Sequence, residues 1–263
     1  MRTLRCVGTG LLALTLAAGI AACGDDDSGD DAESTDSSSG EQVSDDAAFC
    51  DAVVEFNGLV NAVELDETST EDDIKSTGED LAPTFQTIVD EAPDSLADTA
   101  TDLNAAIQDL TQGDPTSFND DATFQKYTDL IEGSVEVCDY NGVDVTAVDY
   151  AYQGLPEEIE AGTTAFTFTN SADSENHMMA ILKKKDGVDL SWDEIIALPE
   201  DEAQASVEEK GAAFAPAGET SAALAELDAG DYLAICFIPV GSPAAEDGPP
   251  HFTQGMQQEF TVT

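Results

Sequence analysis

The chain has very few basic residues to balance its acidic ones. Of 263 residues only 8 are Lys or Arg, against 56 Asp or Glu, and the formal net charge is −48 at pH 7. A field of this sign repels nucleic acid and anionic lipid head groups, so neither is expected as a partner. We interpret the acids as a solvated surface. Because such a surface repels itself unless salt screens it, we expect halophilic behaviour, with stability rising toward molar salt.

Histidine is scarcer still, with His177 and His251 as its only two occurrences. No serine, histidine and acid follow one another in a recognisable catalytic order, which disfavours a hydrolase, and we expect a protein that is not an enzyme. Long apolar runs are also missing. The longest one at the N-terminus, residues 10–22, is too short to span a membrane.

That apolar run has the features of a secretory signal, because Arg2 and Arg5 precede it. It ends in Ile20-Ala21-Ala22-Cys23, which resembles the bacterial lipobox. The resemblance implies that residues 1–22 are a lipoprotein signal peptide, that diacylglycerol is attached to Cys23, and that the protein is extracytoplasmic, lipid-anchored to the outer face of the cell membrane. The alternative is an ordinary secretory signal that happens to stop near a cysteine.

Residues 23–46 contain almost no apolar side chains. Such a segment cannot bury enough surface to offset the entropy lost on ordering, so we expect an acidic disordered tether.

Three of the five cysteines remain once Cys6 leaves with the signal and Cys23 takes the lipid: Cys50, Cys138 and Cys236. Three is an odd number, so in an oxidising compartment two should pair and one should have another task.

Residues 47–143 have helical periodicity, with apolar residues at spacings of three and four in four successive stretches. Thr70 is the expected N-cap of the second helix, and Pro83 should kink or split that helix. The third helix is expected to end at Gly113, and Asn141-Gly142 should stop the fourth.

The positions of Cys50 and Cys138 predict a disulfide. Cys50 lies near the start of the first helix and Cys138 near the end of the last. A bond between them would close a small helical bundle and contribute roughly 4–5 kcal/mol in the chain-entropy model. The bundle contains no histidine and no catalytic set, so we interpret it as a structural or partner-binding domain.

Residues 144–263 change to short apolar segments separated by Gly, Pro, Asn and Asp, which predicts a β-sandwich. One helix should interrupt it, because Ser191-Trp192-Asp193-Glu194 is a capping box. Two motifs stand out: Ile159-Glu160-Ala161-Gly162-Thr163 before a strand, and Ala217-Gly218-Glu219-Thr220 further on. With Cys236, a later histidine and a closing Gly-Met, they make Val145–Thr263 resemble the cupredoxins, the family of plastocyanin and azurin.

The resemblance implies a Greek-key β-sandwich with a mononuclear type 1 blue copper site. In it, His177, Cys236 and His251 would be equatorial ligands and Met256 the axial one. A thiolate, two imidazoles and a weak thioether serve both Cu(I) and Cu(II) without large rearrangement. Fourteen residues separate Cys236 from His251, more than the family usually has, but loop-closure entropy grows only logarithmically with length.

Two functions follow from these expectations. The first is a membrane-anchored, copper-binding electron-transfer protein, with a redox partner protein that the sequence does not identify. The alternative is a cupredoxin-like lipoprotein without redox function, which holds copper, binds a ligand or acts as an assembly module.

Overall fold

The computed structural model describes residues 46–63, 65, 68–245 and 247–263. The expected signal peptide 1–22, the lipid-attachment residue Cys23 and all of the acidic tether except Asp46 lie outside the described residues. Among the helices that are described, none combines the length and the apolar character needed to cross a membrane.

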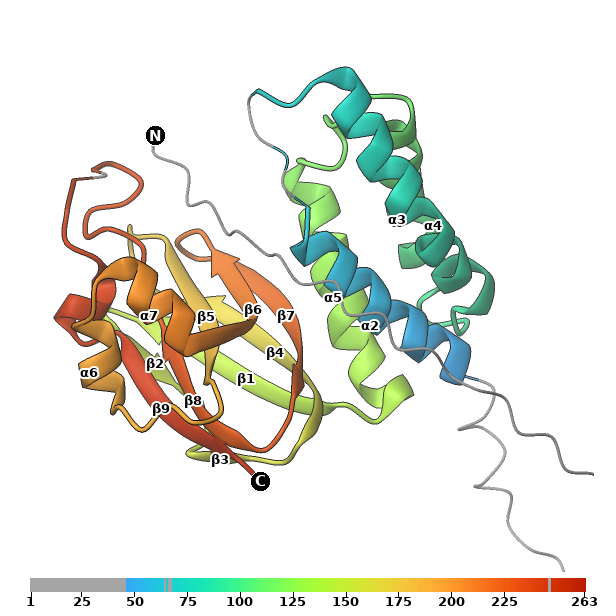
Figure 1. The fold of residues 1–263 in the computed structure, drawn as a ribbon. Coiled ribbons are helices and arrows are strands. Elements are labelled where there is room, and N and C mark those ends of the chain that lie inside the picture. The colour runs from blue at the N-terminus through green and yellow to red at the C-terminus, as the bar shows by residue number, and fades with distance from the viewer. Residues whose placement is uncertain (1–45, 64, 66–67, 246) are drawn as a thin grey trace, which may run out of the picture. The chain divides into compact units, whose positions relative to one another are not determined.

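The N-terminal part of the described chain is the expected helical bundle (Figure 1). Cys50 and Cys138 form the predicted disulfide, which joins the first turn of the first helix to the end of the fourth. Burial of one face of each helix forms the bundle core, mainly from Phe, Leu, Ile and Ala side chains. The helices are α2 (Ala47–Asn61), α3 (Glu71–Glu91), α4 (Ala97–Thr111) and α5 (Asp121–Cys138).

Helix α3 begins as the sequence predicts, with Thr70 and Asp73 capping each other's backbone N–H groups. The expectation that Pro83 splits this helix is wrong, because α3 continues through it to Glu91. Leu81 and Phe85 are buried on either side of the proline. Packing of this face keeps the helix continuous although Pro83 removes one backbone hydrogen bond.

Helix α5 ends at Cys138, two residues earlier than a stop at Asn141-Gly142 would imply. Asp139 adopts the left-handed conformation with φ 54°, and Tyr140 N–H donates to the Val135 carbonyl at 3.1 Å. Asn141 and Gly142 are already part of the first strand, so they do not stop the helix.

The rest of the chain forms a two-sheet β-sandwich. One sheet has the strand order β2-β1-β4-β7 and the other β3-β9-β8-β5-β6, and the chain passes repeatedly between them, as in a Greek key (Figure 1). Its apolar core lies between the sheets. The strands are β1 (Asn141–Val148), β2 (Ala151–Gln153), β3 (Glu158–Ile159), β4 (Gly162–Asn170), β5 (His177–Lys184), β6 (Val207–Ala215), β7 (Thr220–Leu227), β8 (Gly230–Ile235) and β9 (Gln257–Val262).

Short helices connect β5 to β6. Helix α6 (Trp192–Ile196) has the predicted capping box between Ser191 and Glu194, and α7 (Glu200–Ser206) follows it. The sequence did not predict β6, because its central residues are glycine and alanine rather than the branched and aromatic residues typical of strands. The predicted fold class is otherwise confirmed: a helical bundle closed by a disulfide and a β-sandwich.

Candidate metal centre

Strand topology brings three distant parts of the chain to one end of a sheet. Strand β8 pairs antiparallel with both β5 and β9, so its C-terminal end lies beside their N-terminal ends. His177 is the first residue of β5, and Cys236 directly follows β8. His251 opens the 3-10 helix η1 (His251–Gln254), and Met256 directly precedes β9.

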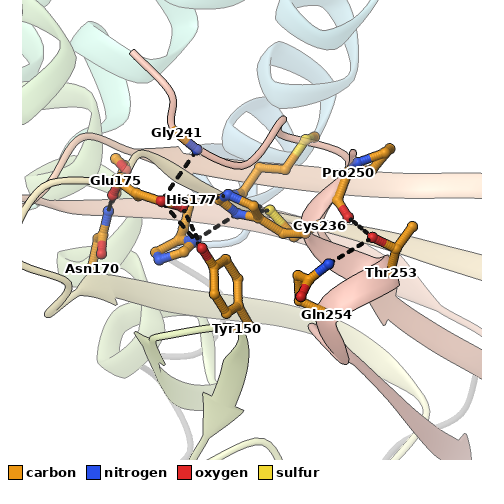
Figure 2. A network of polar contacts seen from close by, with 12 residues as sticks. Tyr150, Asn170, Glu175, His177, Cys236, Gly241, Pro250, Thr253 and Gln254 are labelled. Carbon is orange, nitrogen blue, oxygen red and sulfur yellow. Dashed lines mark hydrogen bonds and ion pairs between the residues drawn. The ribbon is translucent and has the colours of Figure 1, made fainter. Parts of the chain in front are cut away.

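Three of the four predicted ligands meet at this end of the sheet (Figure 2). His177 Nδ1 is 3.0 Å from His251 Nδ1, and Cys236 Sγ is 3.4 Å from the same His251 atom. One ligand atom from each residue lies within 4.8 Å of the others. All three side chains are buried, and Cys236 is not in a disulfide. The two ring nitrogens and the sulfur therefore face a common point.

Met256 is hydrogen-bonded through its backbone to two of the other three residues, Cys236 and His251. Its carbonyl accepts from Cys236 N–H at 3.1 Å, and its N–H donates to the His251 carbonyl at 3.2 Å. The Met256 side chain is fully buried in the sandwich core. The backbone of Met256 thus connects the two predicted ligands that precede it, and its role as the axial ligand stays a prediction.

Hydrogen bonds draw Cys236 and His251 together despite the fourteen residues between them. His251 N–H donates to the Ile238 carbonyl at 2.9 Å, and Val240 N–H donates to the Pro249 carbonyl at 2.9 Å. Pro239 and Pro250 form an isolated antiparallel bridge between these bonds. The inserted loop (237–250) therefore closes at its base like a hairpin, and its length adds nothing to the separation of the ligands.

The sulfur of Cys236 is buried and has the backbone N–H groups of Met178 and Ile238 as neighbours. Met178 N–H points to Sγ at 3.4 Å, and the Met178 carbonyl is held by Tyr152 Oη at 2.6 Å. Burial raises the pKa of the Cys236 thiol. The thiol therefore keeps its proton at neutral pH until a metal ion displaces it.

Both imidazoles are neutral at pH 7. Burial, together with repulsion from the neighbouring His251, lowers the pKa of His177 to about 4. Burial also lowers the pKa of His251. A neutral imidazole has a lone pair for a metal, whereas a protonated one has none. Within the described part of the chain His177 Nε2 is buried without a hydrogen-bond partner.

Sequence reasoning missed three residues around the cluster. Glu175 Oε2 lies 2.8 Å from His251 Nε2, and the Tyr150 ring packs edge-on against the His251 ring at 5.0 Å between centroids. Asn170, fully buried, donates to the Glu175 carbonyl at 2.8 Å. Glu175 is one of 56 acidic residues, so nothing in the composition distinguished it. Its position two residues before His177 was the only available signal.

The donor set fits a copper ion in its residue types. Two neutral imidazoles and a sulfur converge in a buried place, and the described cluster includes no carboxylate among its three members. Such soft and borderline donors favour copper or zinc over magnesium or calcium. The predicted ligands lie in the order that the cupredoxin resemblance implies, one at the start of β5 and three around the loop before β9. The strand region is a two-sheet β-sandwich.

Solved structures similar to the chain include two auracyanins. The reduced auracyanin of the photosynthetic bacterium Roseiflexus castenholzii is 22% identical, with 47% of this chain and 97% of that chain covered and a TM-score of 0.31. Auracyanin A of Chloroflexus aurantiacus, a "blue" copper protein, is 20% identical, with 46% and 98% covered and a TM-score of 0.31.

A Cu-containing nitrite reductase of Thermus scotoductus is 8% identical, with 47% of this chain and 31% of that chain covered and a TM-score of 0.26. No protein-family model matches the sequence, and no curated protein matches it. Similarities this low do not establish a shared function. The case for a metal centre in the β-sandwich rests on the convergence of His177, Cys236 and His251.

Proposed function

We propose that the protein binds one copper ion through His177, Cys236, His251 and Met256 and transfers single electrons without being an enzyme. The observation that carries the proposal is the convergence of both histidine Nδ1 atoms and Cys236 Sγ in a buried cluster. Bound copper would supply a one-electron couple. Strand pairing and the hydrogen bonds at the base of the loop hold the donors together, so little rearrangement is needed when the oxidation state changes.

Each residue of the cluster has a separate task in this proposal. The two imidazoles offer their Nδ1 lone pairs, and Cys236 gives up its proton on binding and ligates as a thiolate. Met178 N–H, 3.4 Å from Sγ, stabilises the sulfur charge that then develops. Water is excluded because the side chains of both histidines and the cysteine are buried.

The test is addition of Cu(II) to the purified protein. A strong visible thiolate-to-copper band should appear at one copper per chain and be absent in Cys236→Ser. Met256→Leu should keep the band but shift the reduction potential. Met179→Leu is the matched control, because Met179 is a core methionine of β5. A colourless wild-type protein, or a band that survives Cys236→Ser, rejects the proposal.

A copper-holding role without electron transfer is the second candidate. Burial of His251 favours it, because its ring presents no exposed edge to a partner protein. Electrochemistry separates the two candidates. Reversible one-electron cycling of the copper-loaded protein supports electron transfer, whereas copper that is lost on each reduction supports a holding role.

We also propose that the protein is extracytoplasmic and anchored to the membrane through Cys23. The basis is the sequence alone, where a basic start and an apolar run end in Ile20-Ala21-Ala22-Cys23. Expression of the full chain in a bacterium, followed by separation of membrane and soluble fractions, tests the anchor. Cys23→Ala should move the protein out of the membrane fraction, and an unchanged distribution would reject the anchor.

A further inference from the structure

We propose that Glu175 is a positioning residue for the metal site. It contacts Nε2 of the His251 ring and accepts a hydrogen bond from the inserted loop, which links the loop to the cluster. Its carboxylate lies 2.8 Å from His251 Nε2 through Oε2 and accepts Gly241 N–H at 3.1 Å through Oε1. Tyr150 Oη lies 3.2 Å from both oxygens. Figure 2 shows this carboxylate between the loop and the cluster.

The contact with His251 selects the tautomer that can bind a metal. A neutral imidazole has one N–H and one bare nitrogen, and an ionised carboxylate only accepts hydrogen bonds. Glu175 Oε2 lies 2.8 Å from His251 Nε2, but the ring N–H is not aligned with it, so the contact is electrostatic rather than a well-formed hydrogen bond. The negative carboxylate favours the hydrogen on this nearer nitrogen, which leaves His251 Nδ1 bare and facing Cys236 Sγ and His177 Nδ1.

The backbone around Glu175 is fixed independently of its side chain. Asn170 Nδ2 donates both to the Glu175 carbonyl at 2.8 Å and to the Ala215 carbonyl at 2.9 Å. Asn176 N–H donates to the Ser242 carbonyl at 3.1 Å, which adds a second link to the loop. The carboxylate is thus held from both sides before any ion arrives, so it restrains the ring at little entropic cost.

Tyr150 contributes through its backbone as well as its hydroxyl. It adopts a left-handed conformation with φ 57°, which is uncommon for a residue other than glycine. This turn between β1 and β2 aims the hydroxyl at Glu175 while the ring rests against His251. A strained residue kept at this place is consistent with a functional constraint on the same network.

The negative charge of the Glu175 carboxylate is also expected to affect the affinity for copper and the reduction potential of the site. A carboxylate hydrogen-bonded to a ligating imidazole makes that imidazole a stronger donor, and loss of such a partner typically costs about 10–100-fold in metal affinity. A stronger donor and a nearby negative charge both favour Cu(II) over Cu(I). Removing the charge should therefore raise the reduction potential of the site.

The inference rests on the proposed function in treating the cluster as a metal site. Its test uses two variants. Glu175→Leu removes both the charge and the hydrogen-bond acceptors with a side chain of similar size, and Glu175→Gln removes the charge but keeps one acceptor oxygen. Asp173→Asn is the matched control, because Asp173 is an exposed carboxylate two residues away. Copper affinity is measured by competition with a chromophoric chelator, and the His251 tautomer by ¹⁵N NMR of the metal-free protein.

Glu175→Leu should lose about 10–100-fold in copper affinity and should lower the Nε2–H population of His251. Glu175→Gln should keep more of the affinity yet raise the reduction potential, and Asp173→Asn should change neither. Wild-type affinity and potential in both Glu175 variants would overturn the inference. If Glu175→Leu fails to fold, Glu175→Gln decides through the potential. If the wild type binds no copper, the copper function fails, and the tautomer in the metal-free protein still decides the role of Glu175.

Discussion

His177 Nδ1 and His251 Nδ1 lie 3.0 Å apart although the two residues are 74 positions apart in sequence. At this distance one nitrogen donates a hydrogen bond to the other, and two protonated rings would repel each other. Both rings are buried, so neither charge could be screened by water. The pair is stable as neutral imidazoles and poorly suited to an acidic solution.

The metal-free protein should therefore lose stability as the pH falls from 6.5 to about 4. In the unfolded chain His177 takes up a proton near pH 6.5, whereas in the folded protein its pKa is about 4. The unfolded state binds more protons in this window, so the free energy of unfolding falls with the pH, by up to about 3 kcal/mol. Urea unfolding followed by fluorescence of Trp192 at several pH values measures it.

The control for this pH effect is His177→Asn, since protonation of the many carboxylates also changes stability with pH. The difference in free energy of unfolding between wild type and variant should shrink or reverse in favour of the variant below pH 6.5. A difference that stays constant between pH 7 and pH 4 would show that His177 has an ordinary pKa.

The base of the inserted loop should not tolerate a methyl group at Gly248. A Cβ there would lie 2.2 Å from the Val240 carbonyl oxygen, a backbone atom that cannot move aside cheaply. Gly248→Ala should destabilise the folded protein by about 1–3 kcal/mol and weaken copper binding. Gly58→Ala is the control, because a Cβ at Gly58 in α2 meets nothing within 4 Å. Thermal unfolding and copper titration of both variants check the prediction.

The disulfide should account for a large part of the stability of the bundle. Cys50 and Cys138 are 88 positions apart, so opening the bond frees a long loop in the unfolded chain. The double variant Cys50→Ser/Cys138→Ser should lose about 4–5 kcal/mol. Far-UV circular dichroism follows the helices during denaturant unfolding, and Trp192 fluorescence follows the sandwich. An unchanged helical transition would contradict the prediction.

Salt should stabilise this protein more than it stabilises most. With a net charge of −48, repulsion between surface carboxylates opposes folding. Raising NaCl from 0.1 to 1 M shortens the Debye length from about 10 Å to about 3 Å, so the melting temperature should rise. Sucrose at matched osmolality is the control, because it is excluded from the protein surface but does not screen the repulsion between carboxylates. A flat or falling melting temperature in NaCl would show that the acidic surface is not an adaptation to salt.

The predicted ligands were accessible from sequence because the chain is so poor in alternatives. With two histidines, and one cysteine left outside the expected signal peptide, the expected lipid anchor and the disulfide, few sets of donors were possible, and the strand pattern supplied their order. Strand β6 was missed because Gly211, Ala212 and Ala213 have no marked strand preference until β5 lies beside them. The split expected at Pro83 is absent because tertiary packing outweighs a local propensity.

Glu175 marks the limit of what the sequence could predict. Its role depends on the inserted loop returning to place Gly241 and His251 on either side of it. In a chain with this many acids, no local pattern separates that carboxylate from the solvated ones. Only the folded loop distinguishes it.

Because Pro239 and Pro250 form a bridge, the distance between Cys236 and His251 does not depend on how many residues lie between them in sequence. The described residues at the tip of the loop, 243–245 and 247, take no part in the hydrogen bonds that close its base. They form an appendage whose size does not affect the positions of the predicted ligands. Relatives of this protein could lengthen, shorten or exchange this appendage without altering the ligand sphere. The same attachment point offers a place to insert a peptide tag or a binding sequence directly above a metal centre.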